Sequence, residues 1–243
     1  MIGLALASPL VSMGSPFELF SVVVLGAMNP AIHHPLWYEH VGLLTAQERA
    51  LALASPDLQI TPAFSQFSLP RLTINCMQAR WAAQTAEEGA FDRVVEIAKA
   101  AMDRLDDTPV SVIGINFDFC RPSGIENVSR ALASKVRSSD LGFEGEGEGD
   151  GVSGSLSFSH SRFFGTTFGT MLVTTTQTVG PHPTDQSRAL VKFNVELRPN
   201  AGPTPGYQRF SLAALLDEHV PAAKIQSAKH LERTLAAIRR AEN

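Results

Sequence analysis

Cysteine is scarce in this sequence, with two residues among 243, Cys76 and Cys120. They lie far apart and form neither a CxxC pair nor a zinc-ligand pattern, which excludes disulfide-rich scaffolds and zinc fingers. In a reducing compartment, buried thiols behave as small apolar side chains. We therefore expect two free structural thiols and a cytoplasmic location; a long-range disulfide between them is the less favoured alternative.

Charge is also sparse, at 18% of residues, with 20 Lys and Arg against 24 Asp and Glu and a formal net charge of −4. No excess of positive charge is available for phosphate backbones, so we expect no nucleic-acid partner. A chain with 44% hydrophobic residues and so few charges leaves part of its surface weakly charged. Such surface is typical of contacts with another protein chain or a second copy.

Long hydrophobic runs are missing. The apolar start "MIGLALASPLVSMG" has no positive segment of the kind that begins a signal peptide, and it is too short to cross a bilayer. We expect neither secretion nor a membrane partner.

Motifs for common chemistries are missing too. The sequence has no GxxxxGK[ST] phosphate loop and no GxSxG nucleophile elbow. The acidic stretch "GFEGEGEGDGVSG" (142–154) imitates the start of a calcium-binding loop, but Ser155 stands where the twelfth, bidentate glutamate is required. Because glycine-rich acidic chain gains little from burial, we predict a solvated loop here and no cofactor or metal.

Several segments have the length and composition of strands. These are "FELFSVVVL" (17–25), an extended region over 64–85 that we read as two strands with a bend or edge position at Pro70, and the runs 155–164, 166–179 and 189–198. Residues 110–119 alternate, which predicts a core face of Ile113, Ile115, Phe117 and Phe119. Asn116 and Asp118 then lie on the opposite face.

Helices are indicated by periodicity and capping. Thr45 and Glu48 form a capping box for a helix ending near Ala54, and residues 87–107 carry an apolar stripe at three- and four-residue steps. Residues 124–136 predict a short helix. Proline and glycine separate the last strand from "SLAALLDEH" and from a final helix over 222–241, which we expect to dock on its own core, with docking on another chain as the alternative. Its predicted apolar line contains Ile225, Ala228, Leu231, Leu235 and Ile238.

Strands clustered between helices, without regular alternation of the two, predict an α+β fold with antiparallel or mixed sheets and helices packed on one face. We divide the chain into an N-terminal half, 1–121, and a C-terminal half, 122–243, which can form one continuous domain. The two halves share no residue-level repeat, so a relation between them is a hypothesis that the element order alone suggests.

The stretch "NPAIHHPLWYEH" (29–40) concentrates His33, His34 and His40. Adjacent histidines in extended chain point to opposite sides, and a helix that begins at Pro35 makes His34 its N-cap. We interpret the stretch as the entrance of a helix. The alternative is a ligand, metal or catalytic site that uses these histidines, together with Asp118 from a cleft between the halves.

The stretch "LTINCMQARWAAQTAEEGAFDRVVEIAKAAMDRLDDTPVSVIGINF" (72–117) resembles a family of uncharacterised, sporadically distributed bacterial proteins. In that family a strand, an amphipathic helix and a strand ending in an asparagine-containing motif follow in this order. The resemblance implies no activity and no catalytic residues. Sporadic distribution implies an accessory or mobile bacterial system, such as phage defence.

The leading hypothesis is a non-catalytic protein that binds another chain or itself. The threonine-rich run "TMLVTTTQTV" favours it, because such a strand suits a sheet edge that pairs with a partner strand. The rival hypothesis is an enzyme or a ligand- or metal-binding protein that uses the histidine-rich stretch.

Overall fold

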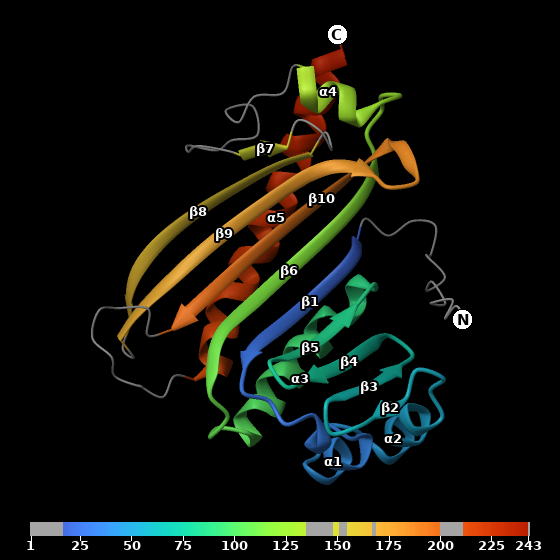
Figure 1. The fold of residues 1–243 in the computed structure, drawn as a ribbon, viewed down its shortest axis with the longest axis vertical. Coiled ribbons are helices and arrows are strands. Elements are labelled where there is room, and N and C mark those ends of the chain that lie inside the picture. Colours follow the sequence, from blue (N-terminus) through green and yellow to red (C-terminus); the bar gives the residue numbers. More distant parts are fainter. Residues whose placement is uncertain (1–16, 135–147, 151–154, 167–168, 200–210, 243) are drawn as a thin grey trace.

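One antiparallel sheet of ten strands runs through the whole molecule (Figure 1). The computed structural model describes residues 17–134, 148–150, 155–166, 169–199 and 211–242. The strands are β1 (Phe17–Gly26), β2 (Gln59–Ile60), β3 (Phe64–Leu69), β4 (Leu72–Met77), β5 (Arg80–Thr85), β6 (Val110–Pro122), β7 (Glu148–Asp150), β8 (Ser155–Thr166), β9 (Gly169–His182) and β10 (Asp185–Pro199). Their order in the sheet is β2-β3-β4-β5-β1-β6-β10-β9-β8-β7. The fold is therefore α+β, with an antiparallel sheet.

The described helices connect and cover these strands. They are α1 (Pro35–His40), α2 (Ala46–Leu53), α3 (Phe91–Arg104), α4 (Val128–Ser134) and α5 (Leu212–Glu242), with short 3-10 turns at Pro30–Ile32 and Glu88–Ala90. Helix α3 contacts β1 and β5, and α5 contacts β6 and β10. Figure 1 shows both helices behind the strands. No helix in the described part of the chain is long and apolar enough to cross a membrane.

The same order of elements occurs twice. A strand (β1), short helices, a four-strand meander (β2 to β5) and a long helix (α3) are followed by a strand (β6), a short helix, a second meander (β7 to β10) and a long helix (α5). β1 pairs with the last strand of its meander, β6 does likewise, and β1 pairs with β6. The division at residue 121 stays a prediction, and the strand order favours a junction between α3 and β6.

The pairing of β1 with β6, which we call the central pair, carries the core. Phe20 lies opposite Phe117, and their rings are 4.9 Å apart. Phe91 of α3 packs on Phe20 at 4.5 Å. Alternate residues along both strands are buried, including every residue of the face predicted for 110–119: Ile113, Ile115, Phe117 and Phe119. That prediction is confirmed.

Residues 64–85 form three strands, so the prediction of two strands is wrong. Leu69 pairs with Leu72, which leaves Pro70 and Arg71 as a two-residue turn, and Met77 pairs with Arg80 across a second two-residue turn. Pro70 therefore lies between strands. Neither turn contains the glycine or asparagine that usually marks a tight hairpin, which is why the sequence did not reveal them.

The C-terminal helix also differs from the prediction. The segment "SLAALLDEH" and the final helix are one helix, α5, of 31 residues that continues through Pro221. Ile225 is 57% exposed and Ala228 is exposed, so these two residues do not belong to the apolar line. The helix packs on its own sheet, as predicted.

The threonine-rich strand is not at an edge, because β9 lies between β8 and β10. Its threonines meet serines of β8 in cross-strand hydrogen bonds of 2.8 to 3.1 Å. Such Ser–Thr pairs stabilise neighbouring strands. The three pairs are Ser157–Thr178, Ser159–Thr176 and Ser161–Thr174.

The acidic stretch predicted as a loop contains the short strand β7, which pairs with Ser155–Ser157 of β8. The prediction is wrong for residues 148–150, since backbone pairing does not depend on apolar side chains. Residues 142–147 and 151–154 lie outside the described part of the chain.

We expect Phe117→Ala to lower the free energy of unfolding by about 3–5 kcal/mol, because it removes a fully buried ring that contacts Phe20 and Phe91. Urea denaturation followed by circular dichroism measures the change. Phe163→Ala is the matched control: this ring is 67% exposed, and its loss should change stability by less than about 0.5 kcal/mol. Equal small effects in both variants would contradict the core assignment.

Candidate functional site

His34 serves as the N-cap of α1. Its Nδ1 accepts a hydrogen bond of 3.1 Å from the backbone N–H of Leu36, and Pro35 occupies the first helical position. Capping supplies a partner for a backbone N–H group that the helix leaves free. The prediction that a helix begins at Pro35, with His34 as its N-cap, is confirmed.

His33 is 1% exposed and belongs to a buried chain of hydrogen bonds. The Tyr38 hydroxyl lies 2.9 Å from its Nδ1, and the Trp81 indole N–H donates to the same hydroxyl at 2.9 Å. The hydroxyl thus accepts from Trp81 and can donate to a neutral His33. Burial lowers the pKa of His33 to about 4, which keeps the ring neutral. This chain of hydrogen bonds ties α1 to β5.

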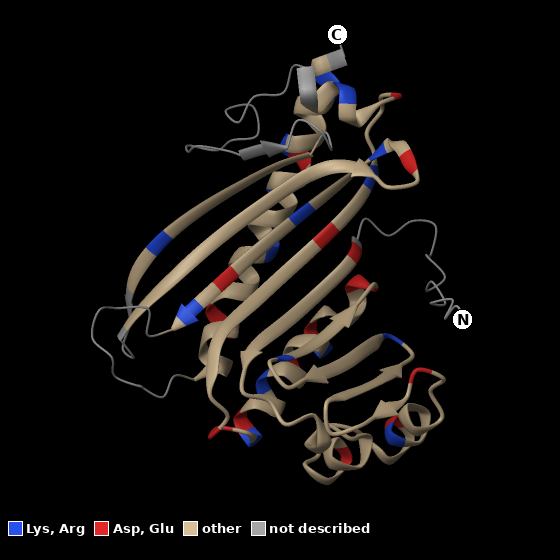
Figure 2. Cartoon of the chain, in the orientation of Figure 1, with Lys and Arg blue, Asp and Glu red and all other residues tan. Residues whose placement is uncertain are grey.

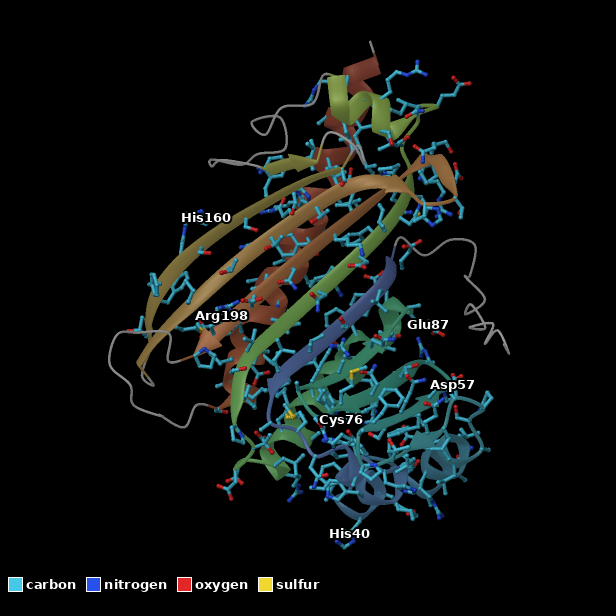
Figure 3. The ribbon with its side chains drawn as sticks, in the orientation of Figure 1. His40, Asp57, Cys76, Glu87, His160 and Arg198 are labelled. Carbon is cyan, nitrogen blue, oxygen red and sulfur yellow. The ribbon has the colours of Figure 1, made fainter. Side chains whose placement is uncertain are left out.

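The other two predicted residues lie elsewhere. His40 is exposed in the last turn of α1, and Figure 3 shows it at the rim of the molecule, directed away from the body. Asp118 belongs to β6, where its carboxylate lies 3.5 Å from the Lys192 ammonium. Burial raises the pKa of Asp118, while Lys192 opposes that shift. A ligand role for His33, His34, His40 and Asp118 stays a prediction, and the hydrogen bonds of His33 and His34 favour a structural role.

The sheet face opposite the buried Phe20 and Phe117 side chains carries uncharged polar residues, with some apolar and some charged residues beside them; we call it the polar face. One uncharged polar residue from each of eight neighbouring strands stands directly opposite the next, forming what we call the polar row. Its members are Ser159, Thr176, Asn194, Asn116, Ser21, Gln84, Thr73 and Ser68.

Hydrogen bonds link members of the polar row to each other. Ser159 bonds Thr176 at 2.9 Å, the Asn116 amide donates to Ser21 at 3.1 Å, and Asn194 donates to Asn116. These contacts fix the rotamers of the side chains in the centre of the sheet. Ser21, at the centre of the row, is buried by its neighbours at 4% exposure.

Most of the charged residues on the polar face form ion pairs. Lys192 pairs with Asp118, and Arg198 pairs with Glu196. Figure 2 shows the strands as mostly free of charged residues, with isolated segments of each sign. A hollow of about 430 Å³ lies on this face, lined by residues of the central pair and of β5, β9 and β10.

A second hollow, of about 440 Å³, lies between the strands β8 and β9 and the helix α5. Two buried polar atoms of residues that line it, His219 Nε2 and Gln177 Oε1, have no hydrogen-bond partner among the residues that the structure describes. Arg162 donates to His160 at 2.6 Å on another wall, and Figure 3 places His160 on β8. Water or a small polar ligand can supply the missing hydrogen bonds.

Glu18, Cys120 and His182 come together at one end of the central pair. Their donor atoms all lie within 4.8 Å of one another, and within the described ranges this is the one such group of three metal-ligand types. Sequence reasoning missed this group, because its members come from three distant segments and have no shared spacing. Only the strand order, which places β1, β6 and the β9–β10 hairpin together, reveals it.

No protein-family model matches the chain, and no curated protein matches it.

We expect the protein to lose stability as pH falls from about 6.5 to about 4, because unfolded His33 binds a proton near 6.5 whereas buried His33 does so only near 4. The difference between these two pKa values corresponds to a loss of about 3 kcal/mol in the free energy of unfolding. Buried His230, whose pKa burial also lowers to about 4, adds to the same trend. In urea denaturation across this range, His33→Gln should show a shallower pH dependence.

His40→Gln is the control for that substitution, because it changes an exposed imidazole in α1, the helix that follows His33. It should keep the pH dependence of the original protein. An identical slope in the original protein and in the His33→Gln variant would contradict a buried, neutral His33.

Proposed function

We propose that this protein is a non-catalytic binding protein that recognises another protein chain through the polar face of its sheet. The polar row is the observation that carries the proposal. The polar row is a continuous series of uncharged hydrogen-bonding residues across eight strands. A sheet face whose role was only to enclose the core would not need such a series. The proposal assumes that the helices cover the opposite face of the sheet. Two contacts support this assumption: Phe91 of α3 packs on Phe20, and His230 of α5 packs on Phe193.

The size of the polar row supports a macromolecular partner. Neighbouring strands lie about 4.8 Å apart, so the seven gaps between eight strands span roughly 33 Å. Strand β9 has 14 residues, which at about 3.4 Å each gives a length of roughly 47 Å. A standard protein interface of about 800 Å² per partner fits on this area.

The chemistry of the face supports a protein rather than a nucleic acid. Phosphate backbones are bound by clusters of unpaired Lys and Arg. Here Lys192 and Arg198 are each paired with a carboxylate, and Arg80 donates to the Asn75 side chain at 2.8 Å. Serine, threonine and amide side chains both donate and accept hydrogen bonds, which suits a partner surface of uncharged polar residues and backbone groups.

The state of the thiols supports a role without catalysis. Burial raises the pKa of Cys76 to about 12 and that of Cys120 to about 11, so both are protonated at neutral pH. A protonated thiol is a poor nucleophile. Buried His33 is engaged by Tyr38 and holds α1 in place.

The biological setting of the proposal rests on the sequence alone. The resemblance of residues 72–117 to a sporadically distributed bacterial family supports a cytoplasmic accessory role, such as phage defence. In that setting the polar face would join this protein to another component of the same system or to a second copy.

A photo-crosslinking amino acid at position 176, where the polar row crosses the middle of β9, should capture a protein partner in host cells or join two copies of the chain. Thr176→Arg should weaken the same complex at least about tenfold, because a charge placed among uncharged groups is costly to desolvate on binding. Mass spectrometry identifies the captured chain, and light scattering measures the mass of the complex.

Position 228 provides the matched control, since Ala228 is exposed on α5. Ala228→Arg should leave the complex intact, and a crosslinker at 228 should capture nothing. Equal capture from positions 176 and 228, or a monomer that captures nothing from either, would refute binding through the polar face.

A further inference from the structure

Three side chains of different ligand types meet where the central pair ends. Glu18 belongs to β1, Cys120 to β6, and His182 is the last residue of β9. Carboxylate, thiolate and imidazole are the ligand types that zinc takes in proteins. Because the three residues come from three strands of one sheet, the backbone holds their Cα positions firmly.

Local irregularities in the strands direct two of these side chains to the third. In the pairing of β1 with β6, Phe17 lies opposite Phe119 and Leu19 opposite Asp118, so Glu18 is an extra residue in a bulge. Bulges re-aim side chains and are common next to functional sites. The pairing of β9 with β10 is also irregular, with a register shift directly after the His182–Asp185 pair.

The distances suit one metal ion. His182 Nε2 lies 3.7 Å from Glu18 Oε1, and Cys120 Sγ lies within 4.8 Å of both donor groups. Two ligands of one tetrahedral zinc, with Zn–N and Zn–O bonds of about 2.1 Å, are roughly 3.4 Å apart. Small side-chain rotations therefore bring all three donors onto one ion.

Burial differs among the three residues in a way that allows an ion to enter. Cys120 is 3% exposed, whereas the side chains of His182 and Glu18 are 24% and 35% exposed. The thiol forms the inner wall, and the other two ligands face solvent. Solvent can then supply a fourth ligand.

The second nitrogen of His182 already has a partner that can orient the ring. Nδ1 lies 3.2 Å from the Thr184 hydroxyl. The backbone N–H of Thr184 also donates to this nitrogen at 3.4 Å, so with Nε2 on a metal a proton on Nδ1 would replace that bond with donation to the hydroxyl.

We propose that Glu18, Cys120 and His182 form a zinc-binding site with three protein ligands and an open fourth position.

Titration of the chelator-treated, full-length protein with Zn²⁺ against a coloured competitor should give one ion per chain. Titration with Co²⁺ should give the intense near-ultraviolet absorption of a thiolate–cobalt bond, which reports directly on sulfur ligation. Cys120→Ser should abolish that absorption and weaken Zn²⁺ binding at least about tenfold.

Cys76→Ser is the matched control, because Cys76 is the other buried cysteine and lies on β4. It should keep both the stoichiometry and the near-ultraviolet absorption. His182→Gln changes a partly exposed residue at a hairpin, so it should fold even if Cys120→Ser does not, and it should weaken Zn²⁺ binding to a similar extent. A Co²⁺ complex without thiolate absorption, or Zn²⁺ affinity unchanged in His182→Gln, would overturn the proposal.

Discussion

The antiparallel pairing of β1 with β6 is the constraint on which the rest of the structure depends. Each strand also pairs with the last strand of its own meander, so the central pair joins two five-stranded units into one sheet. The rings of Phe20, Phe91 and Phe117 meet beneath it and exclude water from the junction. Every feature on the polar face takes its position from the register of these two strands.

The sequence predicted best those elements whose two faces differ. Residues 110–119 alternate between large apolar and small or polar side chains, so both strand and orientation could be derived. The capping box at Thr45 and Glu48 likewise fixed the start of α2, where both reciprocal hydrogen bonds are present. In these places local chemistry and tertiary packing agree.

Prediction failed where tertiary packing overrode a local signal. Pro221 normally ends a helix, yet α5 continues through it, because the buried Leu215, Leu216 and Leu235 on either side hold one helix against the sheet. The threonines of β9 suit an edge strand as well as a central one, and only their pairing with the serines of β8 decides between the two.

The candidate sites were the least accessible to sequence reasoning. The histidines that stand close together in the chain diverge in space, with His33 buried, His34 capping a helix and His40 exposed. Glu18, Cys120 and His182, which are remote in the chain, converge. Proximity along a chain predicts a shared site only where the intervening backbone is regular, and the turn before α1 is not.

The uneven distribution of tryptophan between the two units has a spectroscopic consequence. Both tryptophans of the chain, Trp37 and Trp81, precede β6, and Trp81 is fully buried against Tyr38. Indole emission therefore reports on the first of the two units alone. The second unit contains no tryptophan and does not contribute to this emission. Far-ultraviolet circular dichroism reports on both units, so coincident transitions by the two methods indicate that the two units unfold together.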